Sequence, residues 1–146
     1  MRIVTVTGAD GAVVEPEWFA RAEGVHRQLR DRLPADYAAK MQRVFAGGGR
    51  MCVAVEGERV VGVAVYRVHE NTSSGRLLYV DDLVTDEAAR SRGVGKALMD
   101  HLQALARASG CETYSLDSGV RRARAHAFYF REGMHVTSFN FKKTLR

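Results

Sequence analysis

Short stretches of apolar residues, most of them alternating with polar ones, recur along the chain and predict β-strands. The stretches are Arg2–Thr7, Met51–Glu56, Arg59–Val68, Leu77–Thr85, Cys111–Leu116 and His135–Leu145. The turn Glu56-Gly57-Glu58 separates two of them, so we expect those two strands to form a hairpin.

Apolar residues in the remaining stretches recur with helical spacing. The predicted helices are Trp18–Leu33, Ala35–Ala46, Gly93–Ala108 and Arg122–Arg131. Pro16 suits the start of the first helix, and Gly133 ends the last one. The elements follow in the order β-α-α-β-β-β-α-β-α-β, which predicts a single α/β domain with a mixed sheet over residues 1–146.

The composition is that of an ordinary globular protein, because 46% of the 146 residues are hydrophobic and 27% are charged. No apolar run is long enough to span a membrane, and the charged residues near the N-terminus do not fit a secretory signal. Cys52 and Cys111 lie far apart in strand-like runs, which predicts two buried free thiols. We therefore expect a cytoplasmic protein with no membrane contact and no metal.

The stretch Arg90–Ala97 (Arg-Ser-Arg-Gly-Val-Gly-Lys-Ala) joins the predicted strand Leu77–Thr85 to the helix that follows it. Its glycines let the backbone approach an anion, and a helix N-terminus attracts negative charge through its free N–H groups and dipole. Three cationic side chains surround the same point, so the stretch suits a pyrophosphate, although Gly-x-Gly can also be only a tight turn. The dinucleotide-binding fingerprint does not fit, and a P-loop is excluded because no Gly-Lys-Ser/Thr follows.

Arg90-x-x-Gly93-x-Gly95 resembles the acetyl-CoA signature of the GNAT N-acetyltransferases, which reads Arg/Gln-x-x-Gly-x-Gly/Ala. In that family the loop binds the pyrophosphate of coenzyme A. The resemblance implies the following pyrophosphate-binding residues: Arg90, Arg92, Gly93, Val94, Gly95, Lys96 and Ala97. It further implies that backbone groups at the end of the preceding strand bind the pantetheine arm, namely those of Leu83, Val84 and Thr85.

A second stretch adds to this resemblance. It begins with Leu116-Asp117-Ser118-Gly119 and continues with Arg122-x-x-Ala125-His126-x-Phe128-Tyr129-x-x-x-Gly133. The whole stretch is similar to the family's C-terminal motif, Asn-x-x-Ala-x-x-x-Tyr-x-x-x-Gly-Phe. Arg122 replaces the family asparagine, and Met134 replaces the phenylalanine. The variant looks like a bacterial subgroup. The resemblance is good over residues 51–146 and covers the first fifty residues only in outline.

Acetyl transfer to an amine needs a polarised thioester, a deprotonated amine and a proton for the leaving thiolate. The resemblance implies that Tyr129 is the general acid; the alternative is a core aromatic. Asp82 falls where many family members carry an acidic base, often acting through water. Alternation would send its neighbour Asp81 to the opposite face, so only one of the two can face a cleft. The alternative for this pair is a β-bulge or strand end that exposes both.

Asp117 and His126 are further candidates for the base, although His126 is more typical of a packed or surface histidine. Two sets of side chains favour opposite kinds of acceptor. An acidic set suits a cationic amine, such as a polyamine, an aminoglycoside or a lysine side chain, and comprises Asp81, Asp82 and Asp117. A basic set suits an acceptor with a carboxylate and comprises Arg121, Arg122 and Arg124.

The resemblance loosely associates the early helical region with the acceptor pocket. Four aromatic residues would then lie near that pocket, or else belong to the core: Trp18, Phe19, Tyr37 and Phe45. The last predicted strand alternates over Ser138–Lys142, which would permit two copies to pair as a homodimer.

The net charge is +5, and the chain from Gly119 onward holds seven Lys or Arg residues against Glu132 alone. This suits a polyanionic ligand, for which coenzyme A and nucleic acid both qualify; the alternative is a solvated charged face, and no nucleic-acid-binding motif accompanies the charge. We therefore predict an acetyl-CoA-dependent N-acetyltransferase with the GNAT fold that transfers the acetyl group directly to a primary amine. The alternative is a non-catalytic acyl-CoA-binding domain on the same fold.

Overall fold

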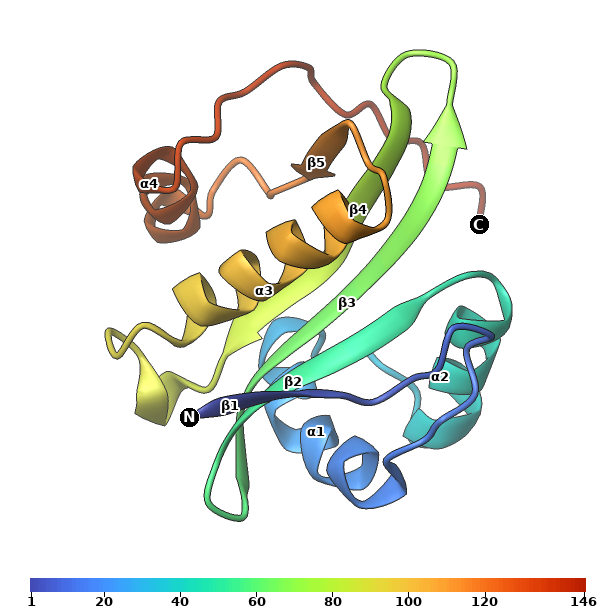
Figure 1. The fold of residues 1–146 in the computed structure, drawn as a ribbon, viewed down its shortest axis with the longest axis vertical. Helices are drawn as coiled ribbons and strands as arrows, with labels where there is room; N and C mark the ends of the chain where they lie inside the picture. The colour runs from blue at the N-terminus through green and yellow to red at the C-terminus, as the bar shows by residue number, and fades with distance from the viewer. The chain divides into compact units, whose positions relative to one another are not determined.

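A computed structural model describes residues 1–146, and its strands form a single five-stranded sheet in the order β1-β2-β3-β4-β5 (Figure 1). The elements are β1 (Arg2–Thr5), α1 (Pro16–Leu29), α2 (Tyr37–Ala46), β2 (Arg50–Glu56), β3 (Arg59–Asn71), β4 (Gly75–Thr85), the 3-10 helix η1 (Glu87–Ala89), α3 (Val94–Ala108), β5 (Thr113–Leu116) and α4 (Ala123–Arg131). The predicted α/β class and the order of the first nine predicted elements are confirmed. The chain divides into two compact units, residues 1–115 and 116–146.

The sheet is mixed. The pairs β1–β2, β2–β3 and β3–β4 are antiparallel. The N–H of Glu112 donates to the carbonyl of Arg76 over 2.8 Å, so β5 begins beside the beginning of β4 and runs parallel to it. Since β5 has four residues and β4 has eleven, β5 reaches along only the first part of that edge. The end of β4, at Leu83–Thr85, is therefore beyond the reach of β5.

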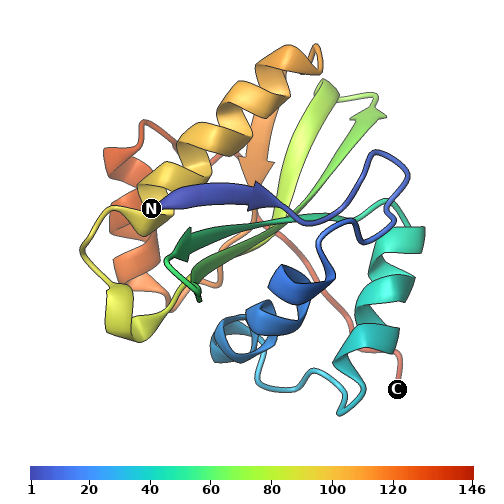
Figure 2. The ribbon, with the colours of Figure 1, turned by 60° about the horizontal axis from the view of Figure 1, so that its bottom comes forward.

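Helices cover both faces of the sheet in the first unit. Figure 2 shows α1 and α2 on one side of the strands and α3 on the other. Phe19, Tyr37 and Phe45 pack with the strand valines Val63 and Val65 in the core under α1 and α2. On the opposite face, α3 buries an apolar stripe that comprises Val94, Leu98, Met99 and Leu102. Apolar side chains recur about every two residues in the strands and every 3.6 residues in the helices. Each element therefore gathers apolar side chains on particular faces, and these faces pack together as layers.

Gly62 of β3 lets α3 lie close against the sheet. A Cβ atom built there would meet Cγ1 of Val94 at 2.7 Å and Cδ1 of Leu98 at 2.9 Å, both below normal contact distance. We expect Gly62→Ala to lower the free energy of unfolding by about 1–3 kcal/mol through overpacking, measured by urea denaturation.

Gly24 provides the matched control for this substitution. It lies within α1, a Cβ atom added to it would meet nothing within 4 Å, and its φ is not positive. Gly24→Ala should raise the free energy of unfolding by about 0.5–1 kcal/mol through helix propensity. Equal effects of the two substitutions would contradict the close packing of α3 on β3.

The first helix ends earlier than predicted, at Leu29 instead of Leu33. Arg27 explains the loop that follows, because its guanidinium donates to the carbonyls of Leu33 (2.8 Å) and Pro34 (2.7 Å). Asp36 then caps α2 by accepting the N–H of Ala39 at 3.0 Å. The loop between the helices is thus held by hydrogen bonds at both ends.

In the second unit, Gly133 follows α4 with φ of 84°, a left-handed conformation that favours glycine. The predicted final strand, His135–Leu145, is wrong, because residues 134–146 form no strand and the side chains of Phe139 and Phe141 are exposed. Alternation alone cannot create a strand, since a strand also needs a neighbour that accepts its backbone hydrogen bonds. The homodimer through Ser138–Lys142 stays a prediction.

No helix in the structure is both long and apolar enough to cross a membrane. Cys52 is buried and Cys111 is half-buried, and neither forms a disulfide. Burial raises the pKa of the Cys52 thiol to about 12, so this thiol stays protonated and unreactive at neutral pH. The prediction of free thiols is confirmed.

Candidate active site

A β-bulge in β4 shapes the polar centre of the first unit. Val65 of β3 pairs with Asp82, but its neighbour Tyr66 pairs with Val80, so Asp81 is an extra residue on β4. Asp81 and Asp82 consequently line the same pocket. The expectation that alternation sends them to opposite faces is wrong, because the bulge interrupts the period of two.

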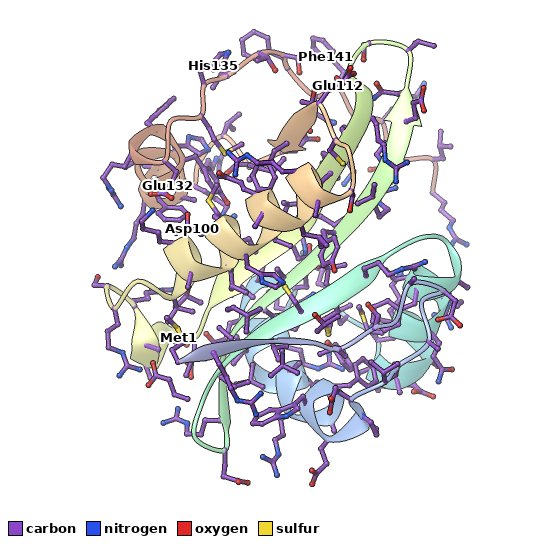
Figure 3. All side chains as sticks on the ribbon, viewed as in Figure 1. Met1, Asp100, Glu112, Glu132, His135 and Phe141 are labelled. Carbon is purple, nitrogen blue, oxygen red and sulfur yellow. The ribbon has the colours of Figure 1, made fainter.

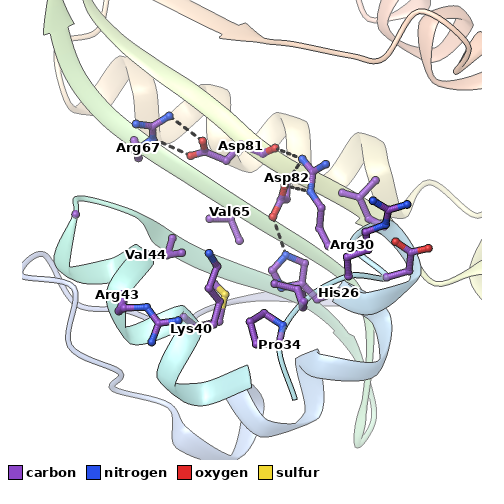
Figure 4. A pocket seen from close by; sticks show the side chains of 16 residues that line it. His26, Arg30, Pro34, Lys40, Arg43, Val44, Val65, Arg67, Asp81 and Asp82 are labelled. Atoms are coloured by element: carbon purple, nitrogen blue, oxygen red, sulfur yellow. Dashed lines mark hydrogen bonds and ion pairs between the residues drawn. The ribbon is translucent and has the colours of Figure 1, made fainter. Parts of the chain in front are cut away.

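This pocket, which we call the bulge pocket, has a volume of about 770 Å³ (Figure 4). Its walls are the end of α1 and the loop after it, one side of α2, β3 and the bulge of β4. The predicted bulge is therefore confirmed, but it does not expose both acids fully, because the side chain of Asp82 is only 13% exposed.

Asp82 is held on both carboxylate oxygens. Nε of Arg30 donates to Oδ1 over 2.7 Å, and Nε2 of His26 lies 2.7 Å from Oδ2. Burial by itself would raise the pKa of Asp82, but the hydrogen bonds from His26 and Arg30, together with the charge of Arg30, outweigh burial and lower the pKa. Asp82 is therefore ionised at neutral pH.

His26 extends the network into the core. The ring is 1% exposed, and its Nδ1 lies 2.8 Å from the hydroxyl of Tyr37. With the proton on Nε2, His26 donates to Asp82 and accepts from Tyr37, so both contacts are satisfied. Burial raises the pKa of Tyr37, and the charges of Glu23 and Asp82 raise it further. The Tyr37 hydroxyl therefore stays neutral and can donate.

His26 and Tyr37 complete a connected chain of side chains that the sequence analysis missed. His26 lies seven residues after Phe19 and four after Ala22, on the buried face of α1. A polar side chain on an apolar helix face needs a buried hydrogen-bond partner. The spacing of His26 from Phe19 and Ala22 was therefore the one sequence signal that could have identified His26 as part of a buried polar network. The partners themselves come from α2 and β4, which only the fold brings together.

Asp81 is paired separately. Arg67 donates to its two oxygens from Nε (2.9 Å) and Nη2 (2.8 Å), a bidentate contact that Figure 4 shows at the strand side of the bulge pocket. Arg30 also donates to the Asp81 carbonyl over 3.1 Å. Each acid of the bulge therefore has its own arginine.

The glycine loop before α3 has the backbone shape that an anion needs. Gly93 has φ of 81° and Ser91 has φ of 64°, and Gly93 offers no side chain to cap the helix that begins at Val94. The N-cap residue therefore supplies no side-chain hydrogen bond to the first turn of α3, and consecutive N–H groups in this conformation form an anion-binding concavity. The loop fits a pyrophosphate.

The cations predicted for this loop lie on the surface around it. Arg90 is exposed and makes no ion pair. Arg92 approaches Glu56 at 3.4 Å, and Lys96 approaches Asp100, which is labelled on α3 in Figure 3, at 3.4 Å. Exposed pairs of this kind are worth about 0–1 kcal/mol, so an anionic ligand can displace them at little cost.

The remaining predicted binding residues, Leu83, Val84 and Thr85, are half-buried at the end of β4. One edge of this segment pairs with β3, from Gly62 to Ala64. The other edge lies past the end of β5, so it can offer backbone groups to an extended ligand.

In the second unit, Tyr129 is half-buried on α4. Burial raises its pKa, and the charge of Arg122 together with its hydrogen bond offsets part of this rise. His126 donates from Nε2 to the carbonyl of Gly119 over 2.8 Å, and Asp117 accepts from Asn140 over 3.0 Å. His126 therefore has a local structural partner, as expected of a packed histidine.

The four early aromatics belong to the core. Phe19, Tyr37 and Phe45 are buried, Trp18 packs partly buried against them, and none lines the bulge pocket. Only Tyr37 contacts the site, through His26. Of the two alternatives for these residues, the core is confirmed.

Comparison with known proteins agrees with this arrangement. A family model described as the acetyltransferase (GNAT) family matches residues 16–134. The uncharacterized N-acetyltransferase YhdJ of Bacillus subtilis is 32% identical over 142 residues, with 87% of this chain and 91% of that protein covered. An aminoalkylphosphonate N-acetyltransferase of Salmonella typhimurium is 33% identical over 66 residues, with 45% and 43% covered.

Solved structures show the same fold. The aminoglycoside N-acetyltransferase AAC(6')-Iy, in complex with the bisubstrate analogue CoA-S-monomethyl-acetylneamine, superposes with a TM-score of 0.80 at 17% identity, covering 99% of this chain and 97% of that one. The chain belongs to the GNAT family of acetyltransferases and is an N-acetyltransferase, as its two motifs predicted.

Proposed function

We propose that the protein transfers the acetyl group of acetyl-CoA directly to a primary amine. The observation that carries this proposal is the uncapped start of α3 at Gly93, where a left-handed glycine loop with cations offers a pyrophosphate site. Membership of the GNAT family and the bulge pocket on the other face of the same strands support it.

Arg90, Arg92 and Lys96 would surround the pyrophosphate, while the backbone from Gly93 to Lys96 would donate N–H groups to it. The N–H of Ala97 already donates to the carbonyl of Gly93 over 3.0 Å, so Ala97 would only line the site. Leu83, Val84 and Thr85 would hold the pantetheine arm through the free edge of β4. When bound, acetyl-CoA supplies the activated acetyl thioester.

Tyr129 is proposed as the general acid. It would give its phenolic proton to the thiolate that leaves as the nitrogen–carbon bond forms and the carbon–sulfur bond breaks. Because burial raises its pKa, Tyr129 remains protonated throughout the neutral range, which is the form an acid requires.

Asp82 is proposed as the base. Its lowered pKa keeps it ionised but makes it a weak proton acceptor, so it suits holding the ammonium and a water molecule through which the proton leaves. Arg30 and His26 would keep the carboxylate in one orientation.

The relatives act on amines of different kinds. The name of the Salmonella protein specifies aminoalkylphosphonates, and the superposed enzyme is an aminoglycoside N-acetyltransferase. Both names specify acetylation of an amine nitrogen, and we propose a primary amine for this protein.

Calorimetric titration of acetyl-CoA tests the donor site. We expect wild-type protein to bind with a micromolar Kd and Arg92→Glu/Lys96→Glu to bind about 100-fold more weakly or not detectably, because each lost charge-assisted contact is worth about 1.5–3 kcal/mol. Arg107→Glu is the control, since Arg107 is exposed in the last turn of the same helix. Absence of binding to the wild type would contradict the proposed function, and binding without turnover of any amine would favour the non-catalytic alternative.

A further inference from the structure

The bulge pocket carries more positive charge than its own acids neutralise. Five basic and three acidic side chains line it. Arg67 and Arg30 are committed to Asp81 and Asp82. The three other basic side chains make no ion pair, and they are Arg32, Lys40 and Arg43. The charge left available to a ligand is therefore positive.

Lys40 is the member of this group that the protein partly buries, whereas Arg32 and Arg43 are exposed at the rim. Figure 4 shows the Lys40 side chain rising from α2 toward Val65 of β3, into the space of the bulge pocket. Its neighbour Val44 on that wall is apolar. Lys40 makes no ion pair, so no acidic side chain of the protein neutralises the charge that it brings to this wall.

The position of Lys40 in α2 adds to this positive potential. Lys40 lies in the first turns of the helix, where the dipole is itself positive and a cation is unfavourable. Asp36, which caps α2, offsets part of this cost, but Lys40 itself makes no ion pair. A ligand anion would compensate the rest of the cost, and it would do so at the same wall of the pocket.

We infer that the acceptor is an anionic primary amine, whose carboxylate, phosphonate or phosphate group binds Lys40 and whose amino group faces the bulge of β4. This inference rests on the proposed function and narrows its substrate class. The paired acids at one end and the unpaired cation at the other match a molecule with charges of both signs. Polycationic amines would instead meet three unpaired cations, Lys40, Arg32 and Arg43, against the single unpaired acid Asp31.

Turnover with a matched panel of amines tests the inference. Release of free thiol is followed with 3-aminopropanoate, 2-aminoethylphosphonate, the uncharged-tail amine 3-aminopropanol and the polycation spermidine. We expect kcat/KM for the better anionic amine to exceed that for 3-aminopropanol by about 10- to 100-fold, and spermidine to be poorer still. The two anionic members separate a carboxylate preference from a phosphonate preference. Equal turnover of charged and uncharged-tail amines would overturn the inference and leave the proposed function intact.

Lys40→Met removes the charge and keeps the length of the stem. We expect it to raise KM for the anionic amine by about 10- to 100-fold, with kcat and the kinetics of 3-aminopropanol little changed. Arg107→Met removes one exposed charge on the far side of the sheet and is the control. An unchanged KM in Lys40→Met would overturn the role of Lys40.

A measurement of amine binding, made without turnover, separates a failure of this inference from a failure of the proposed acetyl transfer. The same anionic amine is titrated calorimetrically into wild type and Lys40→Met, each saturated with coenzyme A. A Kd about 10-fold or more higher in the variant supports the inference even if no amine is acetylated, in which case the proposed function alone fails. Equal Kd values, or no binding to the wild type, would overturn the inference.

Discussion

Replacing Tyr129 with phenylalanine is expected to lower kcat by about 10²- to 10⁴-fold while KM for acetyl-CoA changes little. The range is that of a positioned general acid, and the substitution removes only the hydroxyl that would protonate the leaving thiolate. Steady-state kinetics at saturating acetyl-CoA measures the effect. Because burial raises the pKa of Tyr129, the wild-type rate should fall through loss of this proton only at a higher pH than for an ordinary tyrosine.

Tyr66→Phe is the matched control for this substitution. Tyr66 is buried in β3, does not line the bulge pocket, and loses the same single oxygen atom. Its kcat should stay within a few-fold of the wild type. If Tyr129→Phe behaves like Tyr66→Phe, Tyr129 is a packing residue and water protonates the thiolate.

Replacing His26 with leucine is expected to lower the free energy of unfolding by about 1–3 kcal/mol for each of two atoms that lose their partner, the Tyr37 hydroxyl and Oδ2 of Asp82. Leucine fills a similar volume, so the loss reports the hydrogen bonds more than a cavity. Urea denaturation measures the change. A loss below about 0.5 kcal/mol, the range of ordinary surface substitutions, would show that the network does not stabilise the fold.

A double-mutant cycle isolates the His26–Tyr37 contact. Tyr37→Phe alone leaves Nδ1 of His26 without its partner, but in His26→Leu/Tyr37→Phe no hydroxyl remains to be unpaired. The double variant should therefore lose less stability than the two single variants together, by about 0.5–3 kcal/mol. Additive losses would contradict the hydrogen bond between them.

Acid unfolding gives an independent check on the same network. The folded state lowers the pKa of Asp82 from its unfolded-state value of 3.8. The contribution of ionised Asp82 to the stability of the fold is therefore complete above pH 3.8, and it is lost as the pH falls through the folded-state pKa. Without the hydrogen bond from His26 the pKa is lowered less. His26→Leu should therefore lose less additional stability than the wild type between pH 4 and pH 2, and an identical dependence would contradict the pairing.

The backbone of the proposed donor site was predictable because its signals are local. Glycines, a helix start and neighbouring cations all lie within Arg90–Ala97, and the structure has the predicted strand, loop and helix there. Most element boundaries were likewise predictable from hydrophobic periodicity and from Gly and Pro. The exception, His135–Leu145, alternates like a strand but has no strand to pair with.

The bulge pocket was not predictable from the same signals. A bulge changes the face of every residue after it, and nothing in Asp81 and Asp82 as neighbours reveals that β4 carries one extra residue there. The partners of Asp82 come from positions 52 and 56 residues away, and each is an ordinary helix residue until α1 packs on the sheet.

The sequence by itself determined the family, the α/β class and the loop that suits a pyrophosphate, since all three depend on residue types at short fixed spacings. Only the tertiary structure decided that both bulge acids line one pocket, that His26 and Arg30 hold Asp82, and that Lys40 is left without a counter-ion. These properties depend on which side chains pack within a few ångströms of one another, and charge pairing and burial at that range are set by the packing of distant segments.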